Sequence, residues 1–288
     1  MVTYTITATA NGCLSQTTDV TVTVNPEPQI AANPQISEQC SGVTTNIQLT
    51  SNVVGTTFSW TTDPVSGITG NTNGTGALIS QSLSNSTSST LEVVYVISPL
   101  TSNNCPGDTI WVRVAVKPNP TGSASPSPDT ICSGETTNIA LSSNPTGATF
   151  TWTASGLNAA AGSGSTIAQT LNNGTNASVN VTYTVTPSLA GCTGTPFQVV
   201  VVVNPTPQLT VTNNAPTICT PASTNIALSS TTSGAVISWT SAAVAGVTGN
   251  ADGSGTSIAQ TLTSSNTTPT TVSYIVSVTA NGCTAPTQ

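Results

Sequence analysis

The chain has 288 residues, of which 36% are hydrophobic and only 4% are charged. Its net charge of −7 arises from nine acidic side chains and two basic ones, Arg113 and Lys117. This composition excludes the basic surface that binds nucleic acid or anionic lipid. No apolar run is long enough for a transmembrane helix, so we expect no membrane insertion in this segment.

The seven cysteines indicate where such a chain works. They occur without any histidine and without a C-x-x-C pair, which argues against zinc and for disulfide bonds. Because disulfides persist outside the cytosol, we expect an extracellular protein.

The chain opens near the end of a repeat, because residues 2–17 match residues 272–287. Three similar copies follow, at 31–118, 119–205 and 206–288. Copies of about 90 residues are long enough to be domains and not solenoid turns. We therefore expect residues 1–30 to be the C-terminal strands of a truncated leading repeat, and the third copy to lack its last strand. Such a segment is typical of a piece of a longer protein.

Apolar and polar residues alternate with a period of two in each copy, which is typical of half-buried strands. Inward positions of the first copy, with equivalents in the other two, are Ile47, Leu49, Phe58, Trp60, Ile79, Leu83, Val93, Tyr95 and Ile97. A strongly apolar last strand follows at 111–116 and 199–203, and the leading segment has one at 20–24. The pattern predicts an all-β fold with an antiparallel β-sandwich of about seven strands in each copy.

Proline-rich junctions of constant length connect the copies. Each late cysteine precedes the next early cysteine by 27 residues, in the pairs Cys13 and Cys40, Cys105 and Cys132, and Cys192 and Cys219. Prolines favour an extended, semi-rigid backbone, and an odd number of antiparallel strands places the two ends of a copy at opposite poles. We expect the copies to form an elongated rod.

Four segments together resemble a known kind of repeat: ICSGETTNIAL at 131–141, FTW at 150–152, VTYTVTPSLAGC at 181–192 and VVVVVNPTP at 199–207. They are similar to the PKD-like, immunoglobulin-like repeats of very large Bacteroidetes surface proteins, often gliding-motility-associated adhesins exported by the type IX system. The resemblance covers essentially the whole chain and implies a tandem array of Ig/PKD-like sandwiches that serves adhesion and surface display. One departure is that the strand tryptophans lack the Asp-Phe-Gly-Asp-Gly sequence that follows them in typical PKD domains.

Two disulfide pairings fit the cysteine spacing. Bonds within each copy would be Cys40–Cys105, Cys132–Cys192 and Cys219–Cys283, with Cys13 unpaired in this fragment. Bonds across the junctions would be Cys13–Cys40, Cys105–Cys132 and Cys192–Cys219, with Cys283 unpaired. We favour the first pairing because each copy carries its own complete pair.

Recurring aromatic and amide residues are predicted to be structural. The tryptophans share a strand face with a second large apolar residue, which favours a core position over a sugar-stacking platform. The glutamines lie between inward positions and are expected to brace a neighbouring loop, while the tyrosines serve the fold. These residues are Trp60, Trp152 and Trp239; Gln81, Gln169 and Gln260; and Tyr95, Tyr183 and Tyr274. Trp111 has no aromatic equivalent and is the one aromatic residue to test for exposure.

Groups that could carry chemistry are sparse. The loop between each tryptophan and glutamine is rich in Gly and Asn, which suits an exposed loop. Isolated acids such as Asp63 and Asp252 form no calcium-binding ladder. Scattered carboxylates without histidine offer no acid–base pair. We therefore expect no metal, no cofactor and no enzymatic activity.

Two short segments concern modification. Asp108-Thr109-Ile110 and Asp129-Thr130-Ile131 are similar to the O-glycosylation motif of the same bacterial group, which implies Thr109 and Thr130 as acceptors. Asn-x-Ser/Thr sequences at Asn85, Asn173 and Asn266 are expected by chance in this composition.

Our leading functional hypothesis is a stalk or fibre segment of a large secreted cell-surface adhesin, with neighbouring repeats of the same chain as partners. One alternative is a module that binds surface glycans or proteins through the Gly/Asn loops or Trp111. Another is an extracellular filament that self-associates head to tail, in which residues 20–24 of one chain complete the third copy of another.

Overall fold

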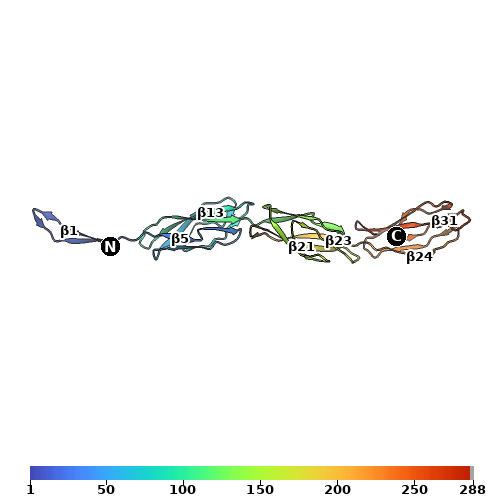
Figure 1. Cartoon of the computed structure of the whole chain (residues 1–288), viewed down its shortest axis with the longest axis horizontal. Helices are drawn as coiled ribbons and strands as arrows, with labels where there is room; N and C mark the ends of the chain where they lie inside the picture. Colours follow the sequence, from blue (N-terminus) through green and yellow to red (C-terminus); the bar gives the residue numbers. More distant parts are fainter. Residues whose placement is uncertain (286–288) are drawn as a thin grey trace. The chain divides into compact units, whose positions relative to one another are not determined.

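The computed structural model describes residues 1–285, in which every regular element is a β-strand (Figure 1). The all-β prediction is therefore confirmed. The chain divides into two compact units, of which unit 1 comprises Met1–Pro120 with Ala190–Cys192, and unit 2 comprises Thr121–Leu189 with the residues from Thr193 onward. Nothing helical in the described part is long and apolar enough to cross a membrane.

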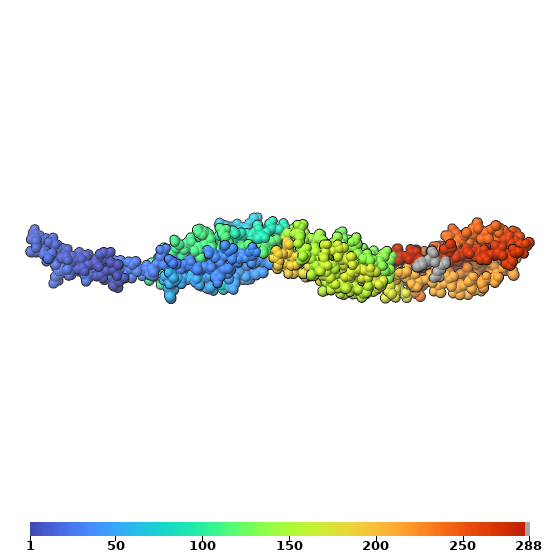
Figure 2. Space-filling model, in the orientation of Figure 1, coloured from blue at the N-terminus to red at the C-terminus, as the bar shows by residue number. Residues whose placement is uncertain are grey.

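The leading segment is a two-stranded ribbon. Strands β1 (Val2–Ile6) and β4 (Thr18–Val22) pair antiparallel, and β2 (Thr9–Ala10) pairs with β3 (Cys13–Leu14). All residues of these four strands are exposed, and the space-filling view shows a narrow ribbon in dark blue (Figure 2). Val2, Tyr4 and Val22 are 45%, 58% and 46% exposed, so their apolar face is not covered by a second layer.

The first repeat is a sandwich of two main sheets. Its strands are β5 (Ile30–Asn33), β6 (Ile36–Cys40), β7 (Ile47–Ser51), β8 (Thr57–Thr62), β9 (Ile68–Thr69), β10 (Gly74–Thr75), β11 (Leu78–Ile79), β12 (Ser84–Asn85), β13 (Leu91–Leu100) and β14 (Ile110–Lys117). One sheet has the order β10-β8-β13-β14-β6, the other has the order β11-β7-β5, and β9 pairs with β12. The edge strand β6 runs parallel to β14, where the sequence predicts antiparallel pairing.

The second repeat has the same plan. Its strands are β15 (Thr121–Ser125), β16 (Asp129–Cys132), β17 (Ile139–Asn144), β18 (Thr149–Ser155), β19 (Gly162–Ser163), β20 (Thr166–Ile167), β21 (Val179–Leu189), β22 (Cys192–Thr193) and β23 (Phe197–Asn204). The larger sheet has the order β16-β23-β21-β18-β19, with β22 on β21, and the smaller has the order β15-β17-β20.

The third repeat departs from this plan at the edge of its larger sheet. Its strands are β24 (Thr210–Asn213), β25 (Ala222–Ser223), β26 (Ile226–Ser229), β27 (Val236–Ser241), β28 (Val247–Thr248), β29 (Gly253–Ser254), β30 (Ser257–Ile258), β31 (Thr261–Ser264), β32 (Tyr274–Ala280) and β33 (Cys283–Thr284). The sheets have the orders β29-β27-β32-β33, β24-β26-β30 and β25-β31-β28. Within residues 1–285 no strand takes the place that β14 and β23 occupy in the other repeats.

Period-two alternation explains the cores. Along β13, Val93, Tyr95 and Ile97 are fully buried, while the residues between them are less so. The predicted inward positions of the first two repeats are all buried. The predicted glutamine strand is interrupted at its glutamine. Its first residues pair as β11, β20 and β30, and in the third repeat its leucine, Leu262, belongs to a separate strand, β31.

Candidate functional site

A tyrosine and a glutamine form the same clamp in each repeat. Tyr95 Oη donates to Gln81 Oε1 at 2.7 Å. The Gln81 amide also holds both backbone groups of Thr72, accepting from its N–H at 3.1 Å and donating to its C=O at 2.6 Å. The equivalent clamps are Tyr183 and Gln169 on Ala160, and Tyr274 and Gln260 on Ala251. The glutamines therefore brace the Gly/Asn loop, as the sequence predicts.

The repeat tryptophans lie in the core, and their prediction is confirmed. Trp60, Trp152 and Trp239 are 6–7% exposed. A glycine of the Gly/Asn loop lies on each ring, and a Cβ on Gly74 would come within 2.5 Å of Trp60. The Gly/Asn loop is thus packed on the tryptophan and pairs with its strand, so it is not the free tip that its composition suggests.

Trp111 is exposed. It lies on β14 opposite Val96, and 55% of its surface is accessible. Its strand also carries Arg113, which forms an ion pair with Glu92 at 2.6 Å. An exposed aromatic ring beside a charged pair fits a surface that contacts a glycan or a protein. A single ring offers only a small area for such a contact.

Burial raises the pKa of Tyr95 to about 12 from the ordinary 10.0, and it raises the pKa of Tyr183 and Tyr274 as well. The folded state therefore favours the neutral phenol, and this stabilisation is complete below pH 10 and lost as the pH rises through about 12. We expect the denaturation midpoint of the first repeat to fall over that interval. In the Tyr95→Phe variant the fall should be smaller, and an equal fall would contradict the assignment.

The cysteines pair in a way that neither proposed pairing anticipates. The bonds are Cys40–Cys192 and Cys132–Cys283, with Cα–Cα distances of 5.5 and 5.7 Å. The predicted bonds Cys40–Cys105, Cys132–Cys192 and Cys219–Cys283 are therefore wrong, as are the alternative bonds across the junctions. Each bond joins the early cysteine of one repeat to the late cysteine of the next. Cys13, Cys105 and Cys219 are free thiols.

Strand length explains why a repeat does not close its own disulfide. Cys132 lies opposite Asn204, at the end of the sheet where Val179 begins β21 opposite Val203. Cys192 follows the other end of β21, whose 11 residues extend over roughly 35 Å. A disulfide requires Cα atoms roughly 4.4–6.8 Å apart. The two cysteines of one repeat thus lie at opposite poles.

Within unit 2, a joint connects the second repeat to the third. Cys283 follows a two-residue turn in which Asn281 and Gly282 have φ of 50° and 84°, so the cysteine lies at a hairpin tip. The tip is held by its disulfide to Cys132 and by Asn204, which donates from Nδ2 to Asn281 O at 2.9 Å. Asn204 is the residue that lies opposite Cys132 in the sheet.

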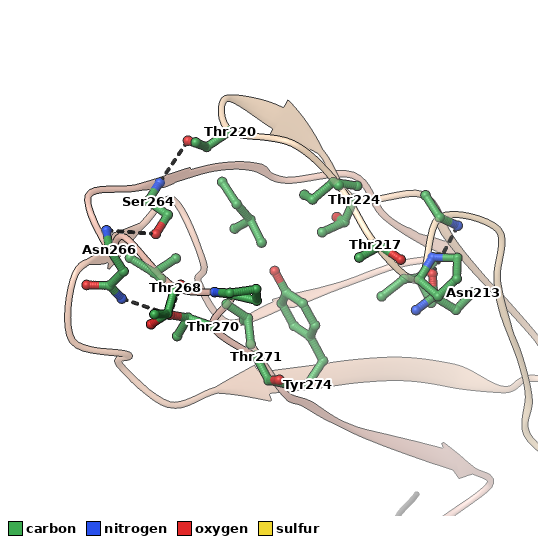
Figure 3. Close-up of a pocket in the computed structure, with 18 of the residues that line it drawn as sticks. Asn213, Thr217, Thr220, Thr224, Ser264, Asn266, Thr268, Thr270, Thr271 and Tyr274 are labelled. Atoms are coloured by element: carbon green, nitrogen blue, oxygen red, sulfur yellow. Dashed lines mark hydrogen bonds between the residues drawn. The ribbon is translucent and has the colours of Figure 1, made fainter.

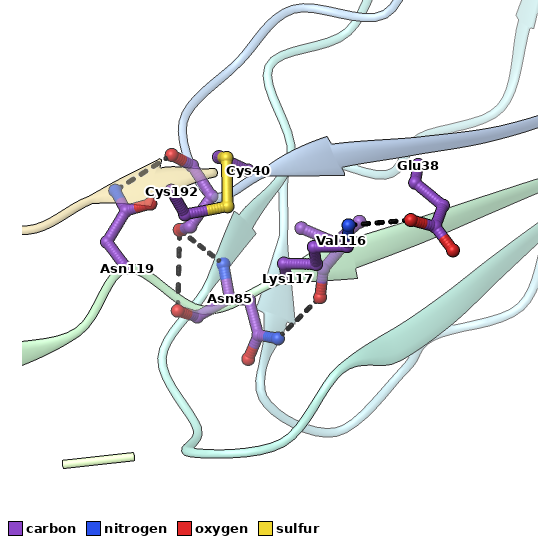
Figure 4. Close-up of a disulfide and its surroundings, with 8 residues drawn as sticks. Glu38, Cys40, Asn85, Val116, Lys117, Asn119 and Cys192 are labelled. Carbon is purple, nitrogen blue, oxygen red and sulfur yellow. Dashed lines mark hydrogen bonds and ion pairs between the residues drawn. A yellow bond between two sulfur atoms is a disulfide. The ribbon is translucent and has the colours of Figure 1, made fainter. Parts of the chain in front are cut away.

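Unit 1 contains the corresponding bond, Cys40–Cys192 (Figure 4). Beside it, Asn119 donates from Nδ2 to Ser41 O at 3.1 Å, and Asn85 donates from N to Ser41 Oγ at 2.8 Å. Lys117, opposite Cys40 in the sheet, pairs with Glu38 at 2.6 Å. Both basic residues of the chain are thus in ion pairs on the larger sheet of the first repeat.

Sequence reasoning missed a role for the asparagines that it assigned to chance. Asn85 is buried and donates from Nδ2 to Val116 O at 2.8 Å, which fastens the last strand of the first repeat. Asn173 is buried and donates in the same way to Val203 O at 2.8 Å. Asn266, the equivalent in the third repeat, is exposed and donates to Ala245 O instead. Recurrence at one position in every copy was the available signal.

A groove of about 550 Å³ opens in the third repeat, between the segments 213–226 and 262–274 (Figure 3). Ile226, Leu262, Val272 and Tyr274 line it and are partly exposed, although their equivalents in the first two repeats are buried. Tyr274 points its ring into this space in Figure 3. The groove lies between the start of β32 and residues 215–218, where β14 and β23 lie in the other repeats.

The remaining candidates are surface residues. Thr109 and Thr130 are exposed, and their glycosylation stays a prediction. Asp252 accepts from Ser241 N at 2.8 Å, as Asn73 accepts from Thr62 N at 2.9 Å, so either side chain can fill this loop position. No three His, Cys, Asp or Glu side chains within residues 1–285 gather as metal ligands do.

Tandem β-sandwiches that are tied by disulfides define the class of this protein as a multidomain β-repeat protein of extracellular type. The chain belongs to the PKD-like domain family, which matches residues 37–120, 129–207 and 216–287. Disulfide-bonded PKD-like repeats indicate an extracellular protein. No curated protein matches the chain.

Solved structures with similar folds are tandem β-sandwich proteins. Mouse cadherin-23 EC22-24 matches 90% of this chain and 95% of its own, with 10% identity and a TM-score of 0.37. The three N-terminal domains of the bacteriophage RB49 outer capsid protein Hoc match 88% of this chain and 90% of their own, with 12% identity and a TM-score of 0.34.

Proposed function

We propose that this chain is a structural stalk or fibre segment of an extracellular surface protein, with no catalytic role, in which each repeat is tied covalently to the next. The observation that carries this proposal is the pairing of early and late cysteines over separations of 152 and 151 residues. An elongated arrangement of the repeats is part of the proposal, and small-angle scattering from the monomer tests it.

The two disulfide loops overlap, which limits how far the chain can be pulled out. The shortest covalent path from Cys40 to Cys283 crosses both bonds and the roughly 60 residues between Cys132 and Cys192. Without the bonds that path has roughly 240 residues. At roughly 3.5 Å per extended residue, its limit falls from about 850 Å to about 210 Å. Between Cys40 and Cys283, tension can therefore extend only the residues from Cys132 to Cys192.

Single-molecule pulling between terminal tags tests this function. The oxidised chain should extend between Cys40 and Cys283 by only about a quarter of the length reached in reducing buffer. The Cys13→Ser variant is the matched control, because Cys13 is free and its loss should change neither length. Equal extension in both buffers would show that the bonds carry no load.

Within this function, we place the chain in a cell-surface adhesin, with gliding motility as the associated process. Support comes from the sequence resemblance and from the extracellular type of the repeats. Labelling of intact source cells by an antibody to this chain checks the surface location, and absence of labelling contradicts it. A glycan-binding role rests on Trp111, and a glycan array should lose signal with Trp111→Ala if that role holds.

A second candidate function is head-to-tail self-assembly by strand addition, which the groove in the third repeat favours. Strand β4 of another copy has the alternating valines of β23. Val20 and Val22 lie opposite Tyr4 and Val2 of β1. The equivalent valines of β23, Val199 and Val201, lie opposite Tyr183 and Val181 of β21. An added strand would cover the partly exposed residues of the groove and satisfy a sheet edge.

A peptide of residues 16–27 tests strand addition. It should bind the chain and protect the backbone amides of β32 from hydrogen exchange. A matched peptide with Val20, Val22 and Val24 replaced by threonine should bind at least tenfold more weakly. The Asn266→Ala variant should also bind more weakly, because Asn85 and Asn173 fasten the equivalent strand. Equal binding of both peptides, or no binding, would rule the candidate out.

A further inference from the structure

The free thiols Cys105 and Cys219 lie where the bonded cysteines of other repeats lie. We propose that Cys219 of one copy of this chain and Cys105 of another form the same disulfide that Cys132 and Cys283 form within one copy. This inference rests on the proposed covalent linkage of repeats and on the strand addition proposed above, and it extends the linkage from one chain to two. The partner is a second copy of this chain, and the bond fixes which ends meet.

Cys219 is an early cysteine without its late partner. The early cysteines of the other repeats lie opposite the residue that ends their last strand, since Cys40 lies opposite Lys117 and Cys132 opposite Asn204. Cys219 has the equivalent place in the third repeat, and its neighbours Ile218 and Thr220 line the groove. A strand in that groove would place its final residue beside Cys219.

Cys105 already lies at the position of a late cysteine. In unit 2, the hairpin tip that carries Cys283 accepts a hydrogen bond from Asn204, the residue after the last valine of β23. In unit 1, Asn103 donates from Nδ2 to Asn25 Oδ1 at 3.2 Å, and Asn25 follows Val24 after β4. Asn103, which contacts the leading segment, is two residues before Cys105. In the same way Asn281, which contacts Asn204, is two residues before Cys283.

Spacing along the chain agrees with this geometry. From the last valine of the apolar run in or just after the last strand to the late cysteine of the following repeat, the separation is roughly 80 residues in each case. The pairs are Val24 and Cys105, Val116 and Cys192, and Val203 and Cys283. If β4 leaves β1 and occupies the groove of another copy, Asn25 would lie beside Cys219 and bring Cys105 with it.

The same register leaves Cys13 without a partner. Cys13 pairs with Ala10 at the β2–β3 hairpin, as Cys283 pairs with Ala280 at the β32–β33 hairpin. In the joined repeat that late position already belongs to Cys283, which is bonded to Cys132. Cys13 is exposed, whereas Cys105 is only partly so. If strand register decides the bond, Cys219 pairs with Cys105. If exposure alone decides it, Cys13 reacts instead.

The bond forms by thiol–disulfide exchange with glutathione disulfide as the oxidant. One thiol loses its proton, and its thiolate attacks the oxidant, which releases one glutathione and leaves a mixed disulfide. The second thiolate displaces the other glutathione. Two protein thiols are oxidised to one disulfide, and one glutathione disulfide is reduced to two glutathione molecules that carry both protons.

The test is oxidation of the purified chain with glutathione disulfide, alkylation of the remaining thiols and peptide mapping by mass spectrometry. Covalent multimers should form through the Cys105–Cys219 peptide. Cys105→Ser or Cys219→Ser should reduce multimers at least tenfold, while Cys13→Ser should leave them unchanged. Multimers linked mainly through Cys13, or a chain that stays monomeric, would overturn the proposal.

The same peptide map separates this inference from the proposed function. If Cys40–Cys192 and Cys132–Cys283 are present but Cys105–Cys219 does not form, only the link between copies is wrong. If those two bonds are themselves missing, the proposed covalent stalk is wrong.

Discussion

Replacing Cys132 and Cys283 together with alanine will lower the free energy of unfolding of unit 2 by about 5 kcal/mol. The bond closes a loop across 151 residues, and a cross-link of that span removes roughly this much entropy from the unfolded chain. It also fixes the hairpin tip at Asn281 to Asn204. The loss should therefore appear both in stability and in protection of that tip.

The measurement is chemical denaturation followed by tryptophan fluorescence, with hydrogen exchange at the β32–β33 tip. Cys105→Ala is the control, because Cys105 is a free thiol and its variant should unfold like the parent. An unchanged midpoint in the double variant would mean that the bond does not constrain the unfolded chain. A shift of similar size in the control would show a general effect of losing a cysteine.

Gly162→Ala will destabilise the second repeat by about 3 kcal/mol, because the new Cβ overpacks a buried ring. It would lie 2.7 Å from Cζ2 and 2.9 Å from Cε2 of Trp152. That ring is 7% exposed and packed in the core, so it cannot turn away. The loop strand β19 would have to leave β18, and the clamp of Gln169 on Ala160 would loosen with it.

The matched control is Gly174→Ala in the same repeat. A Cβ at Gly174 meets nothing within 4 Å, and the residue is not in the left-handed region. Its variant should stay within about 0.5 kcal/mol of the parent. Thermal unfolding of the two variants decides the matter, and equal stability would mean that the Trp152 ring moves aside.

The strands and the core could be predicted because both follow from local sequence. Period-two alternation along β13 is enough to place Val93, Tyr95 and Ile97 inward, and the structure buries all three completely. The pairing of a tryptophan with a second apolar residue likewise indicated the core. The glutamines were expected to brace a loop because a buried amide needs partners, although only the structure shows that the loop is the Gly/Asn loop.

The disulfides could not be predicted because pairing depends on which pole each cysteine occupies. Because both belong to one copy, the sequence favours a bond between Cys132 and Cys192. In the structure, the length of β21 separates them by roughly 35 Å. The two residues before each of Cys13, Cys192 and Cys283 have positive φ, as a hairpin tip requires. The Asn-Gly pair before two of these cysteines was therefore the available signal that late cysteines project from the end of a repeat.

The groove in the third repeat could be recognised only by comparing the structures of the three copies. Ile226 and Tyr274 belong to the same pattern as their buried equivalents, so sequence alone places them in the core. They are partly exposed because no described strand covers them, and Asn266 turns to Ala245 for the same reason.

Overlap of the two disulfide loops also bears on survival among proteases. A cut at any one peptide bond between Cys40 and Cys283 lies inside at least one loop, so both fragments stay attached through Cys40–Cys192, Cys132–Cys283 or both. One cut in the first repeat and one in the third still leave three fragments that are held as one molecule. A nicked chain of this kind keeps its length and its connection to whatever lies on either side.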